Sequence, residues 1–106
     1  MNDVHALHEF AQCKIRLTAD LVRSPHSPQR RDTCSRLLKE AEELLERVVQ
    51  LDAPPTRHAW AWYDLGRVRR WLRKPVNDVA DAFDQAADVN PGDPALTREL
   101  SKNRRL

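Results

Sequence analysis

The chain has 106 residues, of which 41% are hydrophobic and 32% charged, and its formal net charge is +2. This length suits one small domain, and the near-neutral charge disfavours nucleic acid as the main partner. The longest uncharged stretch is far shorter than the roughly 20 apolar residues of a membrane-spanning helix, and the start, MNDVHALHEF, lacks the hydrophobic run of a signal peptide. We therefore expect a soluble cytoplasmic protein that does not contact a membrane.

The first predicted unit is a hairpin of two long helices over residues 3–51. Its first helix runs from Asp3 to about Arg23, and its apolar face contains Leu7, Phe10 and Ala11. The segment Ser24-Pro25-His26-Ser27-Pro28 predicts a turn. The second helix begins from a cap at Ser27-Pro28 or at Asp32, and its apolar residues are Ala41, Leu45, Val48 and Leu51. Because both helices are long, we expect the tip of this hairpin to project.

The polar residues of this hairpin give no sign of catalysis or cofactor binding. His5 and His8 have a spacing that can bind metal, but no third ligand is fixed beside them, so we interpret them as exposed residues without function. Cys13 and Cys34 are interpreted as small buried hydrophobes rather than a disulfide. Glu42-Glu43 should face water. The chain also lacks a phosphate-binding loop, a nucleophile elbow and a plausible triad, so we expect a non-enzymatic protein without catalytic or metal-binding residues.

The next predicted helix, at residues 56–74, has two different stripes. The core stripe contains Trp62, Leu65, Gly66, Val68 and Leu72. Gly66 costs about 1 kcal/mol relative to alanine inside a helix, so we expect another helix to cross close to it. Arg69 projects from the same stripe, and a buried guanidinium requires a partner. We therefore predict that Arg69 pairs with a carboxylate from a neighbouring helix.

A fourth and a fifth helix complete the predicted set. The fourth ends at Asn90 before Pro91-Gly92, and its apolar face contains Val76, Val79, Ala80, Phe83, Ala86 and Ala87. Asp93-Pro94 then supplies a cap and a first-turn proline for a last helix that extends to about Arg104. Leu96 and Leu100 should let this helix cover the open end of the preceding pair. With only two glycines and no alternating strand pattern, the sequence predicts an all-α fold of about five helices.

Residues 59–92 resemble the tetratricopeptide repeat (TPR), a helix-turn-helix unit of 34 residues. The residues that match its pattern are Trp62, Leu65-Gly66, Phe83, Ala86 and Pro91, with one extra residue in the Arg73–Asn77 turn. Arg69 and Val79 depart from the family, which usually has Tyr and Ala there. The resemblance implies one TPR-like domain over 1–106, built of antiparallel helix hairpins stacked as a short superhelix. Its parts are a degenerate first hairpin at 3–51, a second repeat at 56–90 and a capping helix at 94–104.

The resemblance also implies a protein–protein interaction module, a scaffold or adaptor, and it places the second stripe of the 56–74 helix on a concave groove. The predicted partner-binding residues on that stripe are Trp60, Tyr63, Arg67, Arg70 and Trp71. Aromatic rings and forked guanidinium groups suit a peptide or helix of a partner, especially an acidic one. The carboxylate clamp of chaperone-binding members is not matched, because its helix position holds Asp64.

Three alternatives stay open at this point. The first alternative is that Trp60 or Trp71 packs under the first hairpin as internal core. The arginines, together with the basic run Arg98, Lys102, Arg104 and Arg105, are compatible with a nucleic-acid-binding helical protein. Two repeats and a cap are also fewer than the roughly three that such stacks need, so a homodimerisation domain is the third alternative.

Overall fold

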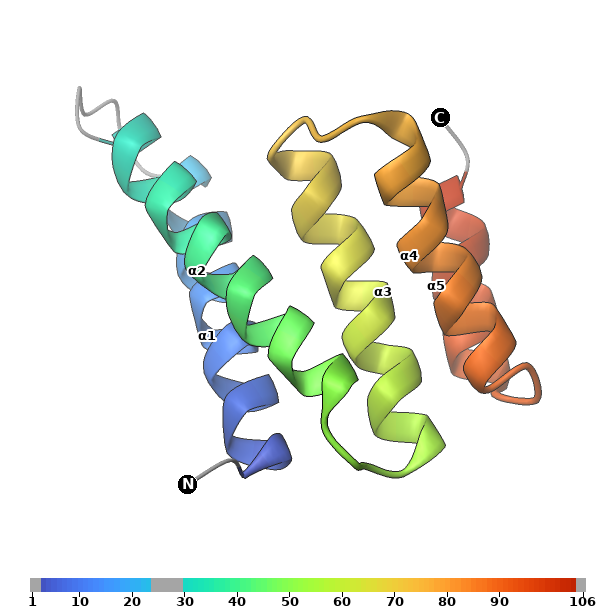
Figure 1. Ribbon diagram of the computed structural model, residues 1–106. Coiled ribbons are helices and arrows are strands. Elements are labelled where there is room, and N and C mark those ends of the chain that lie inside the picture. The colour runs from blue at the N-terminus through green and yellow to red at the C-terminus, as the bar shows by residue number, and fades with distance from the viewer. Residues whose placement is uncertain (1–2, 24–29, 105–106) are drawn as a thin grey trace.

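Residues 3–23 and 30–104, which the computed structural model describes, form five helices and contain no strand (Figure 1). These helices are α1 (Val4–Arg23), α2 (Arg30–Gln50), α3 (Pro55–Trp71), α4 (Val76–Val89) and α5 (Pro94–Arg104). The predicted all-α fold is confirmed, and the ends of the helices lie within a few residues of their predicted positions. The turn at Ser24–Pro28 and the cap at Ser27-Pro28 lie outside the described residues. None of the helices that the structure describes is both long and apolar enough to cross a bilayer.

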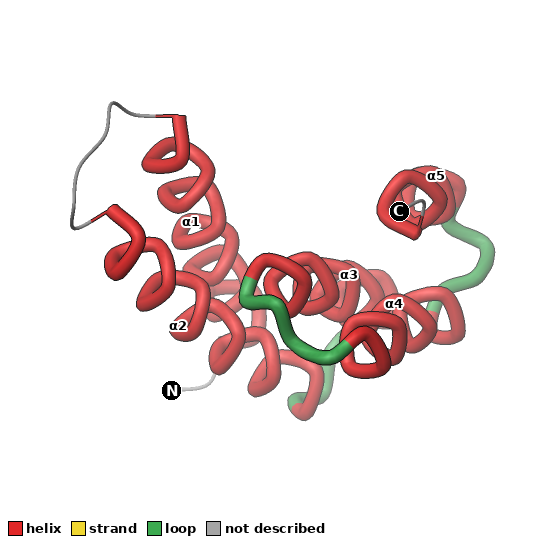
Figure 2. The backbone as a smooth tube through the Cα atoms, turned by 90° about the horizontal axis from the view of Figure 1, so that it is seen from above, coloured by secondary structure: helices red, strands yellow, loops and turns green. Residues whose placement is uncertain are grey.

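The helices form two antiparallel hairpins, α1 with α2 and α3 with α4, and α5 packs on the second hairpin. In Figure 1, α2, α3 and α4 stand in a row. Figure 2 shows that α1 and α5 lie on the same side of that row. The central helix α3 therefore contacts all four of the other helices, and it packs against neighbours on both of its long faces.

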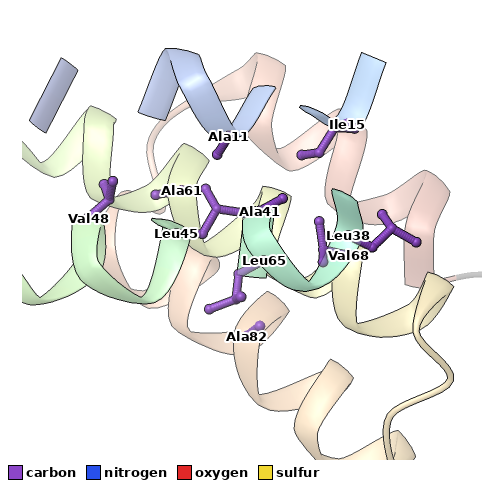
Figure 3. Packing of buried hydrophobic residues seen from close by; sticks show 10 residues of the cluster. All are labelled: Ala11, Ile15, Leu38, Ala41, Leu45, Val48, Ala61, Leu65, Val68 and Ala82. Carbon is purple, nitrogen blue, oxygen red and sulfur yellow. The ribbon is translucent and has the colours of Figure 1, made fainter. Parts of the chain in front are cut away.

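One core cluster joins the two hairpins, and its side chains converge between α1, α2 and α3 (Figure 3). Its buried members are Ala11, Ile15, Leu38, Ala41, Leu45, Val48, Ala61, Leu65, Val68 and Ala82. The predicted face of α1 is wrong in part, because Phe10 is 56% exposed whereas His8 and Ile15 are buried. The reason is that α2 and α3 pack along the line of His8, Ala11 and Ile15, which leaves Phe10 on the outer side of α1.

A second cluster joins α3, α4 and α5, and contains Ala59, Tyr63, Phe83, Ala86, Leu96 and Leu100. The prediction for Gly66 is confirmed: a Cβ atom placed there would lie 2.5 Å from the Phe83 ring. Because α4 seats Phe83 against this glycine, the helix is rotated from its predicted orientation. Val76 is 75% exposed and Ala80 is also exposed, while Ala82, which the sequence pattern did not select, is fully buried.

Local interactions explain where the helices begin and end. Asp3 and Asp93 cap α1 and α5: the Asp93 Oδ1 atom accepts hydrogen bonds from the Ala95 and Leu96 N–H groups at 3.0 and 3.2 Å, as predicted. Asp32 is not a cap, because α2 begins two residues earlier, at Arg30.

At the end of α3, Lys74 N–H donates to the Arg69 carbonyl at 2.9 Å in a Schellman turn. Arg73 occupies its left-handed position, φ 59°, which glycine usually takes.

Arg69 confirms its predicted pairing with carboxylates of the neighbouring helix. Its Nη2 atom lies 3.5 Å from Glu46 and its Nε atom 3.8 Å from Glu42. Glu42 is consequently mostly buried rather than facing water, and only Glu43 is exposed as predicted. Arg69 thereby ties α3 to α2 at the edge of the core.

The two cysteines are free thiols, and neither is a buried hydrophobe. Cys13 is exposed, since it lies on the outer side of α1 with Phe10, and Cys34 is partly exposed. The prediction that both are buried is therefore wrong.

Candidate functional site

The predicted partner-binding face of α3 is divided by α5 into a covered part and an open part. Trp60 and Tyr63 belong to the covered part. The Trp60 indole N–H donates to Asp93 Oδ2 at 3.3 Å, and its ring meets Tyr63 edge-on at 5.4 Å between centroids. Tyr63 is only 5% exposed, and its hydroxyl donates to Glu99 at 3.3 Å and accepts from Asn103 at 3.0 Å. These two residues therefore contact α5 and its Asp93 cap within the same chain.

The environment of Tyr63 also affects its ionisation. Burial raises the pKa of the phenol above its ordinary value, and the nearby carboxylates of Glu99 and Asp64 add to this effect. The cation of Arg67 and the hydrogen bond from Asn103 act in the opposite direction. Because burial dominates, the phenol stays protonated and serves as a structural hydrogen-bonding group.

Arg70 likewise contacts α5. Its guanidinium lies over the Phe83 ring at 5.3 Å and donates to both the side chain and the carbonyl of Asn103. A cation at the carbonyl end of a helix stabilises that helix. Trp60, Tyr63 and Arg70 together form a contact between α3 and α5. The alternative that Trp60 packs under the first hairpin is wrong, because its contacts are with the α3–α4–α5 cluster.

Arg67 and Trp71 form the open part of the predicted face. The Arg67 guanidinium lies 5.3 Å from the Trp71 ring and 5.5 Å from the Tyr63 ring, and its Nη1 atom is 3.5 Å from Asp64. Trp71 is 43% exposed, which is unusual for a tryptophan. A large aromatic surface held by a stacked guanidinium thus remains accessible at the carboxyl end of α3.

A cleft of about 800 Å³ opens beside Trp71, between the end of α3 and the tip of the α1–α2 hairpin. Its lining comprises Thr18, Ala19, Val22, Arg23, Arg30, Arg31, Cys34, Ser35, Leu38, Trp71, Leu72 and Arg73. Four of these residues are arginines, and none is a carboxylate. The remainder of the lining is mainly apolar. We refer to this site as the basic cleft.

The basic cleft exists because the first hairpin is longer than the helix that packs on it. With 20 and 21 residues, α1 and α2 exceed α3, which has 17. In Figure 1, α2 lies close to α3 at their joined ends and leans away toward the hairpin tip. Val22 continues the buried line of Ile15 and Thr18 along α1, yet it is 62% exposed. The apolar seam of the hairpin therefore runs on beyond the helix that covers it.

No sequence pattern assigned the arginines of the basic cleft to a site. Arg23, Arg30 and Arg31 flank the loop between the first two helices, and Arg73 follows α3. The signal that could have joined them was the greater length of the first hairpin, which was predicted to project. What the sequence does not give is that the last turn of α1 and the first turns of α2 lie beside Trp71.

A buried polar network between α1 and α3 was also missed. His8 is almost fully buried, and its Nε2 atom lies 2.9 Å from Asp64 Oδ2. Arg57 Nη1 lies 3.1 Å from His8 Nδ1 and Nη2 lies 2.6 Å from His5 Nδ1. Because arginine can only donate, the His8 Nδ1 atom accepts and its Nε2–H donates to Asp64. His8 was predicted to be exposed, which is wrong. Its position three and seven residues before Ala11 and Ile15 was the available signal.

This network has the geometry of a structural clamp. Both ring nitrogens of His8 are occupied by hydrogen bonds, which hold the ring in place between α1 and α3. Gln12 also donates to Asp64 at 3.3 Å and completes the shell of that carboxylate. Across residues 3–23 and 30–104, no three His, Cys, Asp or Glu side chains lie in a group suited to a metal ion. The network therefore fixes α1 on α3, and the basic cleft is the candidate functional site.

No protein-family model matches this sequence, and comparison with curated proteins and with solved structures gives no match either.

Proposed function

We propose that this chain is a protein–protein interaction module of the tetratricopeptide type, an adaptor that binds a peptide or helix of a partner protein without catalysing a reaction. The observation that carries the proposal is the basic cleft, in which four arginines and no carboxylate surround an apolar lining next to the exposed Trp71. The proposed binding residues are therefore Arg67 and Trp71 from the original prediction, extended by the arginines of the cleft.

The composition of the cleft supports a protein ligand. Tryptophan and arginine are the residue types most enriched among binding hot spots, and arginine grips carboxylates with two parallel hydrogen bonds. The cleft has an apolar floor formed by Val22, Leu38 and Leu72. Contacts to a phosphate backbone are polar, so nucleic acid would not use this floor. The close contact between Gly66 and Phe83, at positions that resemble the repeat signature, supports the tetratricopeptide assignment.

Site-specific photo-crosslinking tests this proposal. A photoreactive phenylalanine analogue at position 71 should form adducts with a partner protein in cells that produce the chain. The same analogue at Gln85, an exposed position on α4, is the matched control and should not form them. Adducts that nuclease removes would indicate a nucleic-acid partner and contradict the proposal. Identical protein adducts from positions 71 and 85 would also contradict it, because the cleft would then have no special role.

A further inference from the structure

We propose that the basic cleft binds an acidic amphipathic helix of the partner. This helix would pack on the part of the apolar seam between α1 and α2 that extends beyond α3, in the same way as α3 packs on the remainder of the seam. This inference rests on the proposed function and specifies the conformation and charge of the bound segment.

The seam itself indicates a helix. Along α2, Cys34 precedes the buried residues Leu38 and Ala41 at the same alternating spacing of three and four residues that continues to Leu45 and Val48. On α1, Val22 extends the corresponding buried line. Such a seam presents the ridges and grooves that accept a helix. Where α3 covers it, Val68 and Leu65 fill the grooves. Beyond the end of α3, Val22 and Cys34 lie in the same kind of groove without cover from the described residues.

The backbone of the cleft walls disfavours an extended ligand. The walls are helices, whose N–H and C=O groups are bonded within each helix except in the end turns. At the end of α3 the Arg69 and Arg70 carbonyls are already bonded by the Schellman turn, and the Thr18 hydroxyl donates to the Lys14 carbonyl at 2.9 Å. An extended peptide would therefore find few backbone partners. A helix satisfies its own backbone groups and can enter an apolar cleft without that cost.

The positive charges of the cleft indicate which residue types should lie on both sides of the apolar stripe of the bound helix. Arg23 and Arg31 come from the hairpin tip and Arg73 from the opposite wall, so cations stand on both sides of the apolar floor. Arg30 already has an interaction within the molecule, and the three other arginines are enough to place cations on both sides. Glutamate or aspartate on both flanks of an apolar stripe would meet these guanidinium groups, while lysine or arginine would be repelled.

A second copy of this chain is a weaker match for the cleft. Its most acidic element is α4, which contains four aspartates and no basic residue. The side of α4 that faces away from the core, however, contains Asn77, Asp81, Asp84 and Asp88. The exposed apolar side chains of α4 are Val76 and Ala80, both in its first two turns, so no apolar stripe runs along its length to cover the floor beside Val22 and Leu38. The occupant that satisfies both halves of the cleft is an amphipathic helix from another protein.

Titration of the full chain with labelled peptides tests the inference. The probes are capped peptides of about 15 residues, long enough to form a helix, with leucines at alternating three and four spacing and glutamates on both flanks. We expect the helical probe to bind at least about tenfold more tightly than a scrambled peptide of identical composition. Replacing its glutamates by lysine should abolish binding.

Charge-reversal variants place the binding in the cleft. Arg31→Glu with Arg73→Glu should weaken the acidic probe at least about tenfold and allow the lysine probe to bind. The matched control is Arg98→Glu, an exposed position on α5, which should leave the affinity unchanged. Circular dichroism of each variant checks that it is folded.

Several results would overturn the inference and still leave the proposed function to the crosslinking test. Equal binding of the scrambled probe would show that charge alone is recognised. Absence of binding by helical probes in all leucine registers would mean that the ligand is not an acidic helix. A concentration-dependent dimer in light scattering that Arg31→Glu abolishes would assign the cleft to a second copy, and displacement of the probe by single-stranded oligonucleotide would assign it to nucleic acid.

Discussion

The aromatic and arginine stripe on α3 has a covered part and an open part. In the covered part, Trp60, Tyr63 and Arg70 contact α5 or its Asp93 cap. In the open part, Trp71 is exposed and borders the basic cleft, with Arg67 stacked on its ring. The residue types are the same, so their chemistry does not decide whether they form core or surface. What decides it is whether a neighbouring helix is placed so that it covers them.

The largest effect should come from the covered region, at the contact of Phe83 with Gly66. Phe83→Ala should destabilise the protein by about 3–5 kcal/mol, because it removes the largest fully buried side chain. Gly66→Ala, which would place a Cβ atom 2.5 Å from the ring, should cost about 1–3 kcal/mol by overpacking. Urea denaturation measures both values. If Gly66→Ala has no effect, α3 and α4 do not cross as described.

A direct comparison of two tryptophans tests the division of the stripe. Trp60→Ala should cost about 2–3 kcal/mol, because it removes packing against Tyr63 and the bond to Asp93. Trp71→Ala should cost less than about 1 kcal/mol, since Trp71 is 43% exposed and lies outside both core clusters. Ligand binding should show the reverse order, with the loss confined to Trp71→Ala. Equal stability losses for the two variants would remove the distinction between covered and open parts.

Replacing Arg73 by glycine in the turn that ends α3, beside the cleft, should increase the stability of the protein. Arg73→Gly should stabilise the protein by about 1 kcal/mol, because glycine adopts the left-handed conformation, φ 59°, without steric cost. The same change removes a cation from the basic cleft, so affinity for an acidic peptide should fall while stability rises. Thermal unfolding and peptide titration of one sample measure both effects. Lys74→Gly, one residue further along the turn, is a control in which stability should not increase.

The smallest effect concerns the covered Tyr63 at alkaline pH. Its pKa is raised in the folded protein, so above pH ~10 the unfolded chain loses the phenolic proton first and stability falls as pH increases. Tyr63→Phe should flatten this part of the stability profile. Because Tyr63 is the only tyrosine, ultraviolet titration of the native protein follows its ionisation alone. A native titration at the ordinary tyrosine pKa would contradict burial under α5.

Local sequence signals were sufficient for the elements of the fold. The helix boundaries follow from proline, glycine and aspartate at the ends, and Asp93 caps α5 as its position indicates. The glycine at position 66 predicted a close helix crossing, and the arginine at position 69 predicted an ion pair. Each of these signals is strong because the alternative, a needless glycine or a buried unpaired charge, costs free energy wherever it occurs.

The orientation of each helix was less predictable. In α4, alanines at positions 80, 82, 86 and 87 make more than one face apolar, and burial of an alanine gains too little free energy to select between them. The tertiary contact of Phe83 with Gly66 selects the face that buries Ala82. In α1, His8 occupies the core side because Asp64 and Arg57, more than 45 residues away in the chain, supply its hydrogen bonds.

The sequence alone thus determined that the protein consists of five helices, where they begin and end, and which residues require a close or charged neighbour, since periodicity, caps and buried charges act over a few residues. Only the tertiary structure decided that α5 covers Tyr63 and that the first hairpin overhangs α3 beside Trp71. These outcomes depend on relative helix lengths and on contacts between distant segments. The length of the first hairpin was predicted from the sequence, but the position of its open end beside Trp71 was not, because contacts between distant segments set that position.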